Sequence, residues 1–138
     1  MEIRTATIQD VDKVIELGSQ LSINERKYYD STVDIHFAQN NQNFFKNAIS
    51  NNDYLAIVAI IEDNIVGFLI GCISETEKYR HIDKIAEIFG MFVNPEFRSQ
   101  GIGNKLVKQF LQWSKDRVKR AKVVVSAPNN RGIEFYRK

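Results

Sequence analysis

The segment Arg98–Gly103, with sequence RSQGIG, joins two stretches of different hydrophobic pattern. Residues 85–93 before it are mostly apolar, as in a buried strand, and residues 104–111 after it have apolar side chains at helical spacing. A strand that turns through glycines into a helix leaves the first amides of that helix unpaired and pointing toward one place. Gly101 and Gly103 let the backbone bend and let a ligand approach without a Cβ in its way. Because free amides and the helix dipole both favour anions, the sequence predicts a phosphorylated cofactor at this turn.

Length and composition are those of one globular domain. The chain has 138 residues, of which 43% are hydrophobic and 26% charged, and its net charge of +2 gives no general argument for nucleic acid. A lone Cys72 excludes an intramolecular disulfide and favours a reducing compartment. The amino terminus does not resemble a secretory signal, and no stretch approaches ~18 consecutive apolar residues. The expected location is the cytoplasm.

The remaining periodicities predict a mixed sheet with helices on both faces. Thr7, followed by an acid three residues later, marks the start of the first helix. The strand–helix–strand unit between residues 85 and 127 predicts a right-handed parallel crossover, with a ligand at the carboxyl ends of its two strands. We expect helices at 7–21, about 44–52, 102–120 and from about 130, strands at 3–6, 54–61, 65–74, 85–93 and 121–127, and irregular structure at 22–42.

Two motifs resemble those of the GNAT superfamily of acetyl-CoA-dependent N-acetyltransferases. The first, Arg/Gln-x-x-Gly-x-Gly/Ala after a strand that ends in Val-x-Pro-x-x-Arg, reads VNPEFRSQGIG at residues 93–103. The second, Asn-x-x-Ala/Gly-x-x-Phe/Leu-Tyr, reads NNRGIEFY at residues 129–136. Both motifs occur in the family's order, and the resemblance covers essentially the whole chain. It implies a mostly antiparallel α/β sheet with a parallel crossover between its fourth and fifth strands.

The resemblance also implies acetyl-CoA as the acetyl donor. No metal is expected, because His36 and His81 lack a metal-ligand spacing with each other or with Cys72. The amides of residues 100–104 would hold the pyrophosphate, and residues 98 and 99 would begin the same turn. The pantetheine arm would pair with the exposed backbone of strand 85–93, where the fourth and fifth strands splay apart. The expected cofactor-binding residues are Met91, Phe92, Val93, Arg98, Ser99, Gln100, Gly101, Ile102, Gly103, Asn104 and Asn129.

Transfer of an acetyl group to an amine requires a base, because an alkylammonium with a pKa near ~10.4 is protonated at neutral pH. Glu87 is the candidate base: it lies on the strand that should hold the donor, among apolar neighbours, and its position is similar to that of the base in the histone-acetylating branch. The alternative for Glu87 is a solvated surface residue. The N–H of Met91 or Phe92 would meet the oxyanion. The resemblance implies that Tyr136 protonates the departing thiolate.

The chain stops at Lys138, whereas family members usually continue through Lys-x-Gly-Phe and two more strands. We therefore expect a single domain, residues 1–138, without the last two strands. Its fifth strand would then be an uncovered edge, which makes a homodimer plausible. Whether the stop is a truncation is left open.

The expected acceptor is an amine-bearing small molecule or a protein amine, with no membrane or nucleic-acid partner. Acidic residues between the first two helices hint at a cationic acceptor; they are Glu25, Asp30 and Asp34. One alternative function is a non-catalytic acyl-CoA sensor. Another is a binding module that uses the basic residues Lys115, Arg117, Lys119, Arg120 and Lys122. Cations near a helix end explain that cluster more simply.

Overall fold

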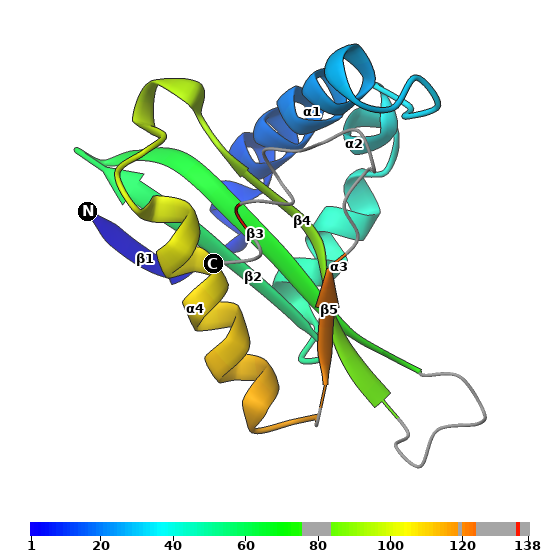
Figure 1. Cartoon of the computed structure of the whole chain (residues 1–138), viewed down its shortest axis with the longest axis vertical. Helices are drawn as coiled ribbons and strands as arrows, with labels where there is room; N and C mark the ends of the chain where they lie inside the picture. The colour runs from blue at the N-terminus through cyan, green and yellow to red at the C-terminus, as the bar shows by residue number, and fades with distance from the viewer. Residues whose placement is uncertain (76–83, 119, 124–134, 136–138) are drawn as a thin grey trace.

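A single sheet organises the computed structural model, which describes residues 1–75, 84–118, 120–123 and 135 (Figure 1). The described residues form five strands in the order β1-β2-β3-β4-β5. Neighbouring strands from β1 to β4 are antiparallel, and β5 is parallel to β4. The predicted mixed, mostly antiparallel sheet is therefore confirmed. The strands are β1 (Glu2–Thr5), β2 (Tyr54–Ile61), β3 (Asn64–Glu75), β4 (Lys84–Val93) and β5 (Ala121–Val123).

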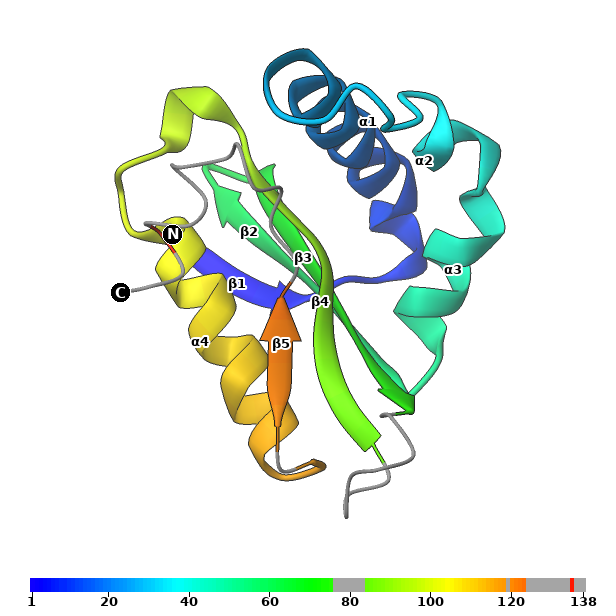
Figure 2. The same ribbon diagram turned by 45° about the vertical axis from the view of Figure 1, so that its right-hand side comes forward.

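Helices cover both faces of this sheet, as expected (Figure 2). The face under α1, α2 and α3 encloses one apolar core, which includes Val14 and Phe68. The opposite face encloses a second core under α4, whose Leu106 and Phe110 are fully buried. The described helices are α1 (Val11–Tyr28), α2 (Phe37–Asn40), α3 (Gln42–Ser50) and α4 (Ile102–Lys115), with short 3-10 turns η1 (Ile8–Asp10) and η2 (Pro95–Phe97).

Two predicted helix boundaries were wrong. The first helix continues to Tyr28 rather than ending near residue 21, because residues 22–28 contain good helix formers and no glycine or proline. The segment expected to be irregular thus holds the end of α1 and all of α2. The last long helix stops at Lys115, not near residue 120. Val118 packs against the core under α4, so the chain has to turn before β5 begins.

Strand β4 contains a β-bulge where it pairs with β3. Ile70 pairs with Gly90 and the next residue of β3, Gly71, pairs with Ile88, so Phe89 is an extra residue. A bulge bends its strand and increases the local twist. The described part of β5 pairs with β4 only at residues 86–88, immediately before the bulge. The rest of the predicted strand 121–127 lies outside the described residues, so the expected splay between β4 and β5 stays a prediction.

Candidate active site

The turn between η2 and α4 bends through two residues in the left-handed region. Ser99 and Gly101 both have left-handed conformations, with φ of 67° and 79°. Gly101 is the N-cap residue of α4, and it makes no side-chain bond to the first-turn amides. A Cβ at Gly101 would meet no atom within 4 Å, so its surroundings are open. The first turn of α4 carries no acidic side chain to oppose an anion.

Gly103 differs from the expectation in one respect. A Cβ at this position would lie 3.1 Å from the Cζ of Phe135 and 3.8 Å from the Cε of Met91. Its missing side chain therefore lets α4 pack closely against Phe135 and β4, instead of leaving room for a ligand. Its backbone amide still belongs to the first turn of α4. The two glycines thus serve different purposes, one a backbone conformation and the other close packing.

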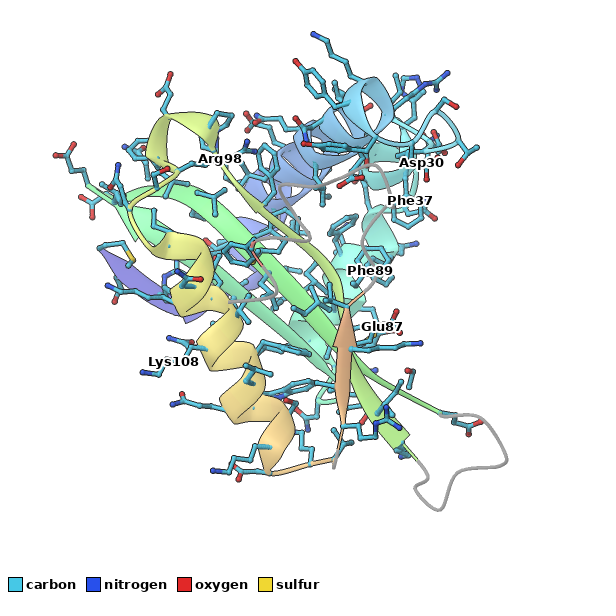
Figure 3. The ribbon with its side chains drawn as sticks, in the orientation of Figure 1. Asp30, Phe37, Glu87, Phe89, Arg98 and Lys108 are labelled. Atoms are coloured by element: carbon cyan, nitrogen blue, oxygen red, sulfur yellow. The ribbon has the colours of Figure 1, made fainter. Side chains whose placement is uncertain are left out.

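Arg98 links this turn to the end of β4 through two side-chain contacts, a role that the sequence did not indicate. Its Nε donates a hydrogen bond to the carbonyl oxygen of Val93 at 2.9 Å. Its guanidinium lies 5.1 Å from the centroid of the Phe92 ring, within the range of a cation–π contact. Figure 3 labels Arg98 at the point where β4 leaves the sheet. Arg98 therefore positions the turn before α4 relative to the strand expected to hold the pantetheine arm.

The direction of each amide in β4 follows from one hydrogen bond at the end of the strand. Asn94 donates its N–H to the carbonyl oxygen of Val66 on β3 at 2.8 Å. Because amides alternate between the two edges of a strand, Phe92 also faces β3, and Met91 and Val93 face the outer edge. The carbonyl of Val93 is already bonded to Arg98. Of the two amides expected to meet the oxyanion, only that of Met91 points away from β3, toward the outer edge of β4.

On the opposite face of the sheet, a cavity of about 310 Å³ lies between α1, the segment before α2 and the β4 bulge. Its lining includes Leu21 and Glu25 from α1, Asp34, Phe89 and Gly90. A Cβ at Gly90 would lie 3.4 Å from Leu21, so glycine at this position keeps α1 close to the strand. This cavity was not predicted, because it depends on how α1 and the bulge meet.

Phe89 forms an aromatic wall beside the cavity with two residues from the helical layer. Its ring centroid is 4.5 Å from that of Phe44 and 5.9 Å from that of Phe37. Figure 3 shows Phe37 and Phe89 next to each other on this face. Phe89 is nevertheless 47% exposed. The bulge has turned Phe89 outward, so that this large apolar side chain stands at the rim of the site.

Glu87 lies one strand repeat before Phe89 and, by the alternation of side chains, on the same face. Its side chain is 28% exposed, and its Oε2 is 3.9 Å from the Nζ of Lys122. Such a partly exposed ion pair is weak. Glu87 faces Cys72 across the β3–β4 ladder, and burial followed by the charge of Glu87 raises the pKa of that thiol. A protonated Cys72 is a poor nucleophile.

Two predicted site residues, Asn129 and Tyr136, lie outside the described residues, and their roles remain predictions. Within the described part of the chain, no group of three or more His, Cys, Asp or Glu side chains could hold a metal ion. None of the described helices is both long and apolar enough to span a bilayer.

The chain matches the model of the acetyltransferase (GNAT) family over residues 20–138. The protein belongs to this family. It is 31% identical over 138 residues to an uncharacterized N-acetyltransferase of Archaeoglobus fulgidus, a match that covers 99% of this chain and 89% of that protein. These similarities identify the GNAT protein as an acyltransferase.

Solved structures support the fold of this GNAT protein. A mutant of the BH1408 protein from Bacillus halodurans superimposes with a TM-score of 0.86 at 23% identity, over 99% of this chain and 90% of that one. The aminoglycoside N-acetyltransferase AAC(6')-Iy, solved in complex with CoA, has a TM-score of 0.77 at 14% identity, over 99% and 87% of the two chains. At these identities the likeness shows the shared fold.

Proposed function

We propose that the protein transfers an acetyl group from acetyl-CoA directly to a primary amine, with both substrates bound at the same time. The observation that carries this proposal is the position of the β4 bulge. The open turn belongs to α4 on one face of the sheet, and the cavity beside α1 lies on the other face, next to the bulge. Donor and acceptor can therefore approach the outer edge of β4 from opposite faces.

The donor side fits the phosphates and the amide groups of coenzyme A. The backbone amides of residues 100–104 would bind the pyrophosphate, because the N-terminus of α4 is electropositive and its surroundings at Gly101 are open. The backbone of Met91 would pair with the pantetheine arm. A protein with the same fold was solved in complex with CoA, which supports acetyl-CoA as the donor. Bound acetyl-CoA would supply a thioester carbonyl at the β4 edge.

The chemistry then needs three groups from the chain. The N–H of Met91 would donate to the carbonyl oxygen as the amine nitrogen attacks the carbonyl carbon. Glu87 would accept the proton that the amine releases. Because Glu87 and Phe89 are one strand repeat, about 7 Å, apart, an amine beside Phe89 would pass its proton to Glu87 through a water molecule. As the C–S bond breaks, Tyr136 would protonate the sulfur, a role that rests on the sequence motif alone.

An added negative charge at the turn tests the pyrophosphate site. Asn104 is exposed in the first turn of α4, where an aspartate would stabilise the helix by about 0.3–1 kcal/mol. We expect Asn104→Asp to weaken CoA binding about tenfold in calorimetry without lowering the melting temperature. Misfolding would lower the melting temperature as well as the CoA affinity, so a loss of affinity at an unchanged melting temperature cannot result from misfolding. The matched control is Gln109→Glu, which places the same charge further along α4 and should change CoA affinity much less.

Thiol release from acetyl-CoA, followed with a panel of amines, tests the transfer itself. We expect release that depends on the added amine. Unchanged CoA affinity in Asn104→Asp would contradict the assigned pyrophosphate site. CoA binding without thiol release from any amine would instead identify a non-catalytic acyl-CoA sensor.

A further inference from the structure

We propose that Lys122 is a positioning residue for acetyl transfer, whose ammonium group keeps the Glu87 carboxylate ionised and therefore able to accept the proton of the amine. This inference rests on the proposed function, because it concerns the base of that reaction. It follows from the register of three neighbouring strands and from the charges that this register brings together.

Lys122 lies directly beside Glu87 in the parallel pair formed by β4 and β5. Side chains of paired residues on neighbouring strands project from the same face of a sheet. The Nζ of Lys122 is 3.9 Å from Oε2 of Glu87. Figure 3 labels Glu87 next to β5. Lys122 therefore belongs to the strand beside the candidate base, whereas Lys115, with which the sequence grouped it, ends α4.

No other cation takes part in this contact within the described residues. Across the β3–β4 ladder Glu87 pairs with Cys72, whose thiol is neutral at pH 7 because burial, followed by the charge of Glu87, raises its pKa. Tyr54 on β2 pairs with Cys72 and is the next residue of the same row. Among the described residues, Lys122 is the only cation within ion-pair distance of Glu87.

The carboxylates on this face of the sheet are farther along it. Glu25 from α1 and Asp34 from the segment before α2 line the cavity whose wall includes Phe89. Both remain in every variant described below, so their influence is the same in each protein that is compared. Differences between the variants therefore report the charge at position 122.

Two opposing influences act on the Glu87 carboxyl group. Its side chain is 28% exposed and lies on the strand face of Ile85, which is buried, and of Phe89. Partial burial favours the neutral form of a carboxyl group, whereas a cation about 4 Å away favours the carboxylate. An amine bound beside Phe89 would displace water and strengthen the influence of Lys122. Removal of Lys122 would leave the effect of burial unopposed.

The pH dependence of thiol release tests this role. The turnover of each variant is divided by that of the wild type at every pH, with the same amine, so the ionisation of the amine cancels. We expect the acid limb of Lys122→Gln to lie about half a pH unit higher, as for a partly exposed ion pair. Its relative turnover should be about one third at the acid end of the profile and unreduced at the alkaline end, where Glu87 is ionised in both proteins.

A series of charges at position 122 makes the test quantitative. Lys122→Glu should double the shift and lower the relative turnover at acid pH to about one tenth. Lys122→Arg keeps the charge and should follow the wild type at every pH. The matched control is Lys46→Glu, the same charge reversal at an exposed residue of α3, which should leave the acid limb in place.

The single cysteine gives a second measurement that needs no turnover. Burial and the charge of Glu87 raise the pKa of the Cys72 thiol, and the charge of Lys122 lowers it. Because the thiolate is the reactive form, Lys122→Gln should slow alkylation of Cys72 by iodoacetamide about twofold, and Glu87→Gln should accelerate it.

The outcomes separate this inference from the proposed function. Turnover of Lys122→Gln that is reduced equally at every pH would indicate a role in folding alone and overturn the inference. An unshifted acid limb, equal behaviour of Lys122→Arg and Lys122→Gln, or unchanged alkylation of Cys72 in Lys122→Gln would also overturn it, and acetyl transfer would stand. Wild-type protein that releases no thiol with any amine would instead refute the proposed function, whatever the alkylation rates.

Discussion

Replacement of Asp10 by asparagine should destabilise the protein at neutral pH. The Asp10 carboxylate is 10% exposed and forms a two-pronged pair with Arg4, at 2.7 Å to Oδ2 and 3.1 Å to Oδ1. The Thr7 N–H donates to Oδ2 at 2.7 Å. The hydrogen bonds from Arg4, with a further contribution from Thr7 and against the opposing effect of burial, lower the pKa of Asp10 from 3.8 to about 2.

This pKa difference sets the size of the effect. Each tenfold change in proton affinity corresponds to about 1.4 kcal/mol, so the folded state prefers the Asp10 carboxylate over the neutral acid by about 2 kcal/mol. Arg4 is 37% exposed, so solvent screens the pair, and about 1–2 kcal/mol is the expected loss in Asp10→Asn. Because the folded pKa is the lower one, the stabilisation is present above about pH 4 and disappears as the pH falls toward about 2.

Urea unfolding, followed by the fluorescence of the single tryptophan, Trp113, measures this effect. The free energy of unfolding of Asp10→Asn should be lower than that of the wild type at pH 7, and the two should converge near pH 2. Asp63→Asn is the control: it removes an exposed acid from the β2–β3 turn, at a left-handed position that asparagine tolerates. If Asp10→Asn and the wild type keep the same difference from pH 7 to pH 2, the ion pair is not the source of the stability.

Two further substitutions test the core and the chemistry. Gly71→Ala would place a Cβ 2.7 Å from the buried ring of Phe110 and should lower the free energy of unfolding in urea by about 1–3 kcal/mol. The control is Gly18→Ala, whose Cβ would have contacts of 3.4 Å inside α1 and which should be neutral or stabilising. Equal effects of the two variants would argue against the close approach of β3 and α4. Glu87→Gln should lower kcat at pH 7 about 100-fold or more without changing CoA affinity. The control is Glu62→Gln, at an exposed residue, which should retain kcat. Full turnover in Glu87→Gln would show that Glu87 is not the base.

Local sequence patterns were sufficient where the physics is local. The hairpin of β2 and β3 was predicted from two apolar runs and a short polar turn, and Glu62 and Asp63 at this turn both have positive φ, as a two-residue hairpin turn requires. The acid three residues after Thr7 marked a helix start, and Asp10 does bind the Thr7 N–H. Gly101, where the sequence predicted a bend of the backbone, has a left-handed conformation and is the N-cap residue of α4.

Helix ends were less predictable, because they depend on more than apolar spacing. Residues 22–28 lack an apolar period, yet good helix formers and the absence of a breaker let α1 continue. That extra length brings Glu25 to the cavity. The basic residues after Lys115 looked helical, but packing of Val118 on the core turns the chain there instead.

The sequence alone determined the family, the order of the elements and the turn that could bind an anion, since each depends on residues that are neighbours in the chain. Only the tertiary structure decided where the two sides of the site meet. The extra residue Phe89 results from the register between β3 and β4, and Gly103 is required by the approach of Phe135. The bond from Arg98 to Val93 and the cavity beside α1 likewise arise from packing between elements, which no pattern of neighbouring residues encodes.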